Sequence, residues 1–224
     1  MTDSIDTLTI LTPTSDAWQL LYQDQHLIVV NKPAMLLTVP GRHPANFDCL
    51  VTRVQQQFPT AQVVHRLDYD TSGLVILPLT KSALSHISKQ FQARTVKKNY
   101  QALVQGKIST DSGRIDAPIA ADAERRPLYK ICHKNGKGSL THYQTISYDE
   151  RRNLSRVALS PVTGRSHQLR VHLLSIGHPI IGDTLYGDAE NIALSPRLCL
   201  HAATIEFCHP ETGQSLKFDA PAPF

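Results

Sequence analysis

One apolar run, residues 74–79, constrains the fold most, because it has the composition of a buried strand. Gly73 precedes this run and permits a tight turn. A cluster of charged and hydrogen-bonding residues lies just before Gly73. That cluster comprises His65, Arg66, Asp68 and Thr71. Polar side chains held at one end of a rigid strand are a common arrangement for an active site. From these residues alone, a surface ion pair between Arg66 and Asp68, worth at most about 1 kcal/mol, explains the cluster equally well.

The rest of the chain predicts many short strands and few helices. Residues 20–31 have the pattern of a hairpin, and Asn135-Gly136 is a typical turn of a second one. Helices are expected to begin at the capping residues Asn46, Thr80 and Ser166, and the last to end at Gly177. About eight strands and about three helices with many hairpins indicate an α+β protein with a mixed, mostly antiparallel sheet.

We predict one domain over residues 18–224, preceded by a loosely held lead-in of residues 1–17 that lacks clear periodicity. A chain of 224 residues is long enough for a sizeable core. The sequence has no run of eighteen apolar residues, so no transmembrane helix is expected. It does not begin with the pattern of a secretory signal, which favours a cytoplasmic protein.

The net charge and the cysteine and histidine patterns indicate which classes of partner, metal site and disulfide to expect. The formal net charge is +4, and the first 31 residues hold four acids and no Lys or Arg, so the remainder is more basic still. This balance gives mild support to a polyanionic partner. The four cysteines form no C-x-x-C pair and the eleven histidines form no H-E-x-x-H motif, so neither a metal site nor a disulfide is expected.

Several motifs, in a consistent order, resemble the RluA family of pseudouridine synthases. Residues 65–73 read His-Arg-Leu-Asp-x-x-Thr-Ser-Gly, which is similar to the family signature. Residues 97–100, Lys-Lys-Asn-Tyr, resemble its basic-Tyr motif, and residues 164–170 resemble its Gly-Arg-x-His-Gln-x-Arg motif. Further similar segments lie at residues 31–33, 178–183 and 200–202. The resemblance covers roughly residues 18–224.

This resemblance implies a cofactor-free conversion of uridine to pseudouridine in structured RNA. It implies a single catalytic domain with a bent sheet, flanked by helices and loops, and an active-site cleft across the sheet. Asp68 is implied as the catalytic carboxylate, which either attacks ribose C1′ or removes a proton from C2′. Arg170 is implied as the partner that keeps it ionised, and Tyr100 as the ring that stacks on the flipped uracil.

The RNA contacts implied by the resemblance are basic or polar. Arg66 is expected to enter the space that the flipped base leaves, and His65 either positions Arg66 or only packs. The other expected RNA contacts are Thr71, Lys97, Lys98 and Arg165. Basic side chains within residues 81–100 and 125–137 are expected to meet phosphates, although such runs are usually just a solvated surface.

The implied partners are a tRNA anticodon stem-loop and a hairpin loop of similar shape in large-subunit ribosomal RNA, bound by a monomer with no membrane association. One alternative is a single-domain relative acting on a different tRNA or rRNA uridine. A second is a non-catalytic RNA-binding domain. A kinase is dismissed, because the sequence lacks a Gly-rich phosphate loop and Asp-Phe-Gly.

Overall fold

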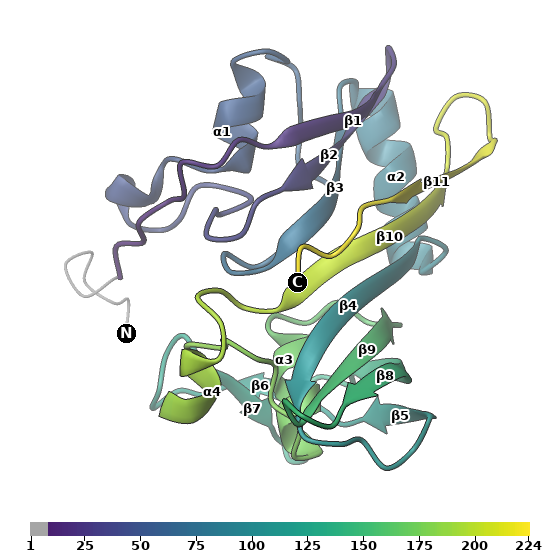
Figure 1. Ribbon diagram of the computed structural model, residues 1–224. Helices are drawn as coiled ribbons and strands as arrows, with labels where there is room; N and C mark the ends of the chain where they lie inside the picture. Colours follow the sequence, from purple (N-terminus) through teal and green to yellow (C-terminus); the bar gives the residue numbers. More distant parts are fainter. Residues whose placement is uncertain (1–8) are drawn as a thin grey trace. The chain divides into compact units, whose positions relative to one another are not determined.

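The computed structural model describes residues 9–224, and the chain separates into two compact units. Unit 1 contains the described residues up to Val96 together with Thr204–Ala220, and unit 2 contains Lys97–Ala203 and Pro221–Phe224. Strand β10 (Leu200–Cys208) contributes residues to both (Figure 1). In their hydrogen-bonded order the strands are β1 (Gln19–Gln23), β2 (Leu27–Lys32), β3 (Ser72–Pro78), β10, β4 (Lys97–Gln105), β9 (Leu154–Pro161), β8 (Leu140–Asp149) and β5 (Ser112–Asp116), with β11 (Ser215–Asp219) on β10. The predicted α+β class with a large, mostly antiparallel sheet is confirmed.

The strands of unit 1 confirm the first predicted hairpin. Strands β1 (Gln19–Gln23) and β2 (Leu27–Lys32) are antiparallel, and β2 also pairs with β3 (Ser72–Pro78). Asp24 closes the turn between β1 and β2, because its Oδ1 accepts the backbone N–H groups of His26 (2.7 Å) and Leu27 (2.9 Å). Every residue of β3 is buried, as its apolar run predicts. Strand β11 (Ser215–Asp219) pairs antiparallel with β10.

The two α-helices of unit 1 differ in how well the sequence predicts them. Helix α2 (Lys81–Ala93) begins at the predicted cap, since Thr80 Oγ1 accepts the N–H of Ala83 at 3.1 Å. Helix α1 (Leu50–Gln55) begins after Cys49, so the predicted cap at Asn46 is wrong. Asn46 lies in a short 3₁₀ helix, η2 (Pro44–Asn46), and its side chain bonds elsewhere.

The described part of the expected lead-in is hydrogen-bonded to unit 1. Asn46 Oδ1 accepts the N–H of Leu11 at 2.8 Å, and Asn46 Nδ2 donates to the carbonyl of Thr9 at 2.9 Å. Arg53 donates to the carbonyl of Thr14 at 2.7 Å. Residues 9–16 are therefore held along the surface of this unit, and residues 1–8 lie outside the described residues.

Unit 2 contains the strands β4 (Lys97–Gln105), β5 (Ser112–Asp116), β8 (Leu140–Asp149) and β9 (Leu154–Pro161). Strands β6 (Ile119–Ala121) and β7 (Tyr129–Ile131) form a separate two-stranded antiparallel sheet, here called the β6–β7 ribbon. The predicted hairpin at Asn135-Gly136 is wrong, because β7 pairs with β6. The N–H of Gly136 instead returns to the carbonyl of Cys132 at 2.8 Å and closes a local turn.

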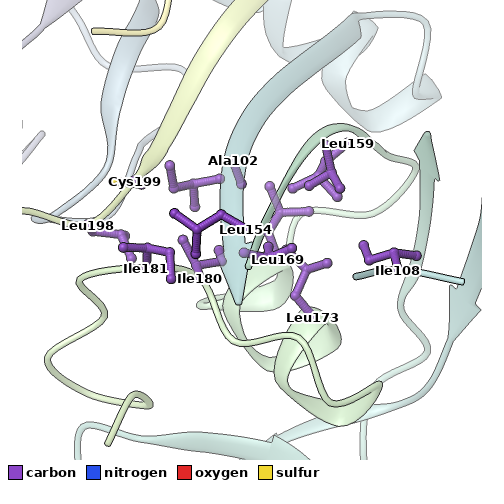
Figure 2. Close-up of a cluster of buried hydrophobic side chains, with 13 residues drawn as sticks. Ala102, Ile108, Leu154, Leu159, Leu169, Leu173, Ile180, Ile181, Leu198 and Cys199 are labelled. Atoms are coloured by element: carbon purple, nitrogen blue, oxygen red, sulfur yellow. The ribbon is translucent and has the colours of Figure 1, made fainter. Parts of the chain in front are cut away.

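Helix α3 (Gln168–Ser175) packs its apolar side on the sheet of unit 2. Leu169 and Leu173 join the buried cluster that includes Ala102 and Leu159 (Figure 2). The helix starts after His167, whose φ is 54°, so Ser166 is not its cap. The Gln168 side chain fixes that turn by accepting the N–H of Arg165 at 3.0 Å.

The predicted end of α3 at Gly177 is confirmed, with a φ of 82°. A shorter helix, α4 (Ala189–Ala193), follows. No helix within residues 9–224 is long and apolar enough to span a membrane.

Candidate active site

In unit 1, Asp68 stands in a turn just before β3. Its carbonyl accepts the N–H of Thr71 at 3.2 Å, while Gly73, with a φ of 119°, already belongs to β3. The tight turn therefore lies at residues 68–71 and not at Gly73, where it was predicted. Asp68 is half-buried, Arg66 is exposed, and Leu67 between them is buried. This alternation anchors the loop through Leu67 and leaves the two charged neighbours with access to solvent.

Two side chains hold the backbone on both sides of Asp68. Thr38 Oγ1 donates to the carbonyl of Leu67 at 2.8 Å and accepts the N–H of Leu67 at 3.1 Å. Lys32, which is fully buried, donates to the carbonyls of Leu36 (2.6 Å), Pro33 (2.9 Å) and Tyr69 (3.4 Å). The residues before and after Asp68 are thus both fixed by side chains, one from the segment that follows β2 and one from the last residue of β2.

Two residues expected to contact RNA have structural contacts inside unit 1. Thr71 is only 2% exposed, and its N–H closes the Asp68 turn. His65 Nε2 accepts the N–H of Ile76 at 2.9 Å, so this nitrogen carries no proton, and its ring stacks on Phe91 with centroids 4.8 Å apart. Of the two roles left open for His65, this geometry favours packing.

In unit 2, the guanidinium of Arg170 is buried in a two-point ion pair with Asp183. Arg170 Nε donates to Asp183 Oδ2 at 2.8 Å and Arg170 NH2 donates to Asp183 Oδ1, and both side chains are 1% exposed. Asp183 Oδ1 also accepts the N–H groups of Leu185 (3.0 Å) and Tyr186 (3.1 Å). A bidentate, charge-assisted pair of this kind fixes the plane of the guanidinium as well as its position.

An aromatic ring supports the same guanidinium from its face. The Cζ of Arg170 lies 5.2 Å from the ring centroid of Tyr186, which is cation–π geometry. The hydroxyl of Tyr186 accepts the N–H of Tyr129 at 2.8 Å and pairs with His167 Nδ1 at 2.8 Å. Arg170 is therefore oriented by a carboxylate in its plane and by an anchored ring on its face.

The remaining expected site residues of unit 2 lie on strands or loops. Tyr100, in β4, stands opposite Leu159 of β9 and is half-buried against the core. Its neighbour Lys97 is exposed, whereas burial lowers the pKa of the half-buried Lys98. Arg165 is exposed, and its Nε donates to the carbonyl of Gly138 at 3.3 Å. Lys97 and Arg165 thus have the exposure that a phosphate contact requires.

Three further residues shape these sites and were not predicted as site residues from the sequence: Thr38, Asp183 and Tyr186. The available signals were indirect. Asp183 ends a segment recognised by resemblance, but nothing in its spacing from Arg170 indicates an ion pair. Within residues 9–224, no group of three His, Cys, Asp or Glu side chains is arranged to hold a metal ion.

The chain is similar to known proteins over most of its length. The RNA pseudouridylate synthase family profile matches residues 26–175, which is more than half of the chain. The chain belongs to this family. A dual-specificity RNA pseudouridine synthase RluA from Yersinia pestis is 50% identical over 204 residues, covering 91% of this chain and 98% of the relative. The RluA of Escherichia coli K12 is 46% identical over 213 residues, covering 95% of this chain and 97% of the relative.

Solved structures agree with the family assignment. Human RNA pseudouridylate synthase domain containing 1 superimposes with a TM-score of 0.80 and 30% identity, covering 96% of this chain and 87% of that chain. Human RNA pseudouridylate synthase domain containing 4 gives a TM-score of 0.72 and 25% identity, covering 92% of this chain and 88% of that chain. The protein is an RNA pseudouridine synthase, an isomerase that converts uridine to pseudouridine.

Proposed function

We propose that the chain has dual specificity and modifies both a uridine in a tRNA anticodon stem-loop and one in a similar hairpin loop of large-subunit ribosomal RNA. The observation that carries this proposal is the 45–50% identity to relatives named dual-specificity RluA, over nearly the whole length of each. An enzyme that reads the shape of a short loop has a physical route to two substrates, because loop shape recurs in unrelated RNAs.

In this proposal Asp68 is the catalytic carboxylate. The reaction breaks the bond between ribose C1′ and uracil N1, rotates the base and joins its C5 to C1′, so no atom is gained or lost. Asp68 either attacks C1′ or removes the C2′ proton to give a glycal. The half-buried position of Asp68 on a clamped turn supports both roles, since the carboxylate keeps access to a substrate while its backbone is fixed.

Arg170 and Tyr100 complete the proposed chemistry. We assign to Arg170 the charge that keeps Asp68 ionised, and its rigid support by Asp183 and Tyr186 favours a positioning role. Tyr100 is assigned to stacking on the uracil, which contributes about 1–3 kcal/mol per base. No cofactor is required, because the isomerisation is redox-neutral and needs no group donor.

The proposed RNA contacts are exposed, apart from the half-buried Lys98. Arg66, exposed on the Asp68 loop, is assigned to the space vacated by the flipped base, and Lys97, Lys98 and Arg165 to phosphates. His65 and Thr71 are reassigned to holding the loop. We further propose that the chain acts as a monomer in the cytoplasm.

The test measures tritium released from uracil C5 when each of the two stem-loops is incubated with the enzyme, without ATP or metal. Dual specificity predicts one pseudouridine in each RNA and mutual competition at a single site. Release from only one RNA would contradict dual specificity. Release from neither would support the alternative of a relative that acts on a different tRNA or rRNA uridine.

A further inference from the structure

A cavity of about 320 Å³ lies in unit 2 beside the β6–β7 ribbon and α3. Its size falls within the range of small-ligand sites. Most of its wall is apolar or aromatic, from Leu128, Tyr129, Ile131, Val171, Leu174 and Tyr186. Leu174, on the side of α3 that faces away from the core, is 38% exposed and adds an accessible apolar side chain to this wall.

Two cations also line this cavity, and one buried carboxylate holds both. Asp122, 1% exposed, accepts Arg125 Nε at 3.0 Å through Oδ2 and Lys130 Nζ at 3.1 Å through Oδ1. The side chains of Arg125 and Lys130 remain 70% and 48% exposed. Two positive charges share one negative charge, so this edge of the cavity keeps a net positive charge and fixed donors that suit an anion.

The cavity adjoins the support of Arg170. Tyr186 lines the cavity and also lies against the guanidinium of Arg170, with 5.2 Å between Cζ and the ring centroid. Its hydroxyl is anchored by the N–H of Tyr129, another residue of the wall. An occupant of the cavity would therefore sit next to a residue of the proposed catalytic machinery, on a wall that does not move freely.

We propose that this cavity binds one unstacked nucleotide of the RNA substrate, distinct from the uridine that is isomerised. The base lies against the apolar and aromatic wall, and its phosphate lies at Arg125 and Lys130. This inference rests on the proposed function. An apolar peptide would not use the positively charged edge of the cavity, and a free anion would not use the apolar wall, whereas a nucleotide contacts both.

The test combines substitution of Leu174 with removal of single RNA bases. A set of stem-loops, each with one abasic loop position, is titrated against the wild-type protein and against Leu174→Gln. We expect one position besides the target at which the abasic change weakens binding about tenfold to the wild type. Leu174→Gln should weaken binding to intact RNA by a similar factor. This variant should bind intact RNA and the RNA with that abasic position equally well.

The matched control is Ile176→Gln, because Ile176 is 37% exposed at the end of the same helix and does not line the cavity. It should bind every RNA as the wild type does. If the losses from Leu174→Gln and from each abasic position simply add, Leu174 contacts no base and the proposal is wrong.

The phosphate half is tested with Lys130→Gln. Loss of one contact to a single-stranded phosphate lowers the slope of log affinity against log salt by about 0.7, and Lys217→Gln, on exposed β11, should leave the slope unchanged. An unchanged slope for Lys130→Gln overturns this half. Tritium release by the wild type, measured on the same RNAs, reports the proposed function separately, so binding results against the cavity with normal release would remove only this inference.

Discussion

The Asp68 loop of unit 1 and the Arg170 helix of unit 2 fix a charged residue in opposite ways. Around Asp68, Lys32 and Thr38 bond to the backbone of neighbouring residues, and the carboxylate itself stays half-buried. Around Arg170, Asp183 and Tyr186 contact the guanidinium directly, and the side chain is fully buried. The difference suits a division of roles: a group that reacts needs access, whereas a group that orients another needs rigidity.

Asp68→Asn tests whether the carboxylate of Asp68 takes part in the reaction. If the carboxylate reacts, its loss should lower turnover by about 10³-fold or more, while RNA binding stays within about tenfold, or ~1.4 kcal/mol. The melting temperature should hardly change, because the clamps act on the backbone. Tritium release, a binding titration and a thermal melt measure the three quantities. Asp70→Asn is the matched control and should keep most activity; retained activity in Asp68→Asn would remove Asp68 from the mechanism.

Asp183→Asn tests the direct support of Arg170. Removing one charge of a buried ion pair leaves the other uncompensated, so we expect a loss of about 3 kcal/mol in the free energy of unfolding and a lower kcat on saturating RNA. Asp188→Asn is the control, since Asp188 only caps α4 and Asn caps equally well. Urea unfolding and saturation kinetics measure both effects. A variant with wild-type stability and kcat would show that Asp183 does not orient Arg170.

Lys32→Met tests the indirect support of Asp68. The change leaves the buried carbonyl of Leu36 and the partly buried carbonyls of Pro33 and Tyr69 without their shared donor, which should cost about 2–3 kcal/mol of stability. Lys217→Met, at an exposed position, should cost less than about 0.5 kcal/mol. Activity at saturating RNA should fall only in the first variant. If urea unfolding gives the two variants equal stability, the lysine does not clamp the loop.

The two regions also differ in how far the sequence predicts them. The Asp24 turn, the buried β3 and the Thr80 cap follow from local signals, because each depends on residues within a few positions. The clamps do not, since Thr38 and Leu67 are 29 residues apart and Arg170 and Asp183 are 13 apart. Such pairs exist only after the fold has brought their segments together.

The wrong predictions have the same cause. Asn46 and Ser166 are good caps by residue type, but Asn46 is bonded to Leu11, far away in the sequence. The turn at Ser166 is organised by the Gln168 side chain, which is itself bonded to Leu140 and Thr141 of β8. At Asn135-Gly136 the turn forms, but β7 finds its partner in β6 rather than across that turn. Local patterns indicated where the chain turns, and tertiary contacts decided what the turns connect.

A smaller effect on stability is expected from His172, which lies inside α3, one turn after its first residue. Its Nδ1 pairs with Thr141 Oγ1 at 2.9 Å and its Nε2 with the carbonyl of Ala117 at 3.0 Å, so the neutral ring donates through Nε2 and accepts through Nδ1. Burial lowers the pKa of His172 below its ordinary 6.5. As the pH falls through 6.5, His172 becomes protonated in the unfolded chain but stays neutral in the folded chain. The free energy of unfolding should therefore fall as the pH drops from 7.5 to 5.5. Urea unfolding at both pH values should show this slope weakened in His172→Gln and kept in His133→Gln, whose side chain is exposed. Equal slopes in both variants would show that protonation of His172 does not destabilise the folded chain.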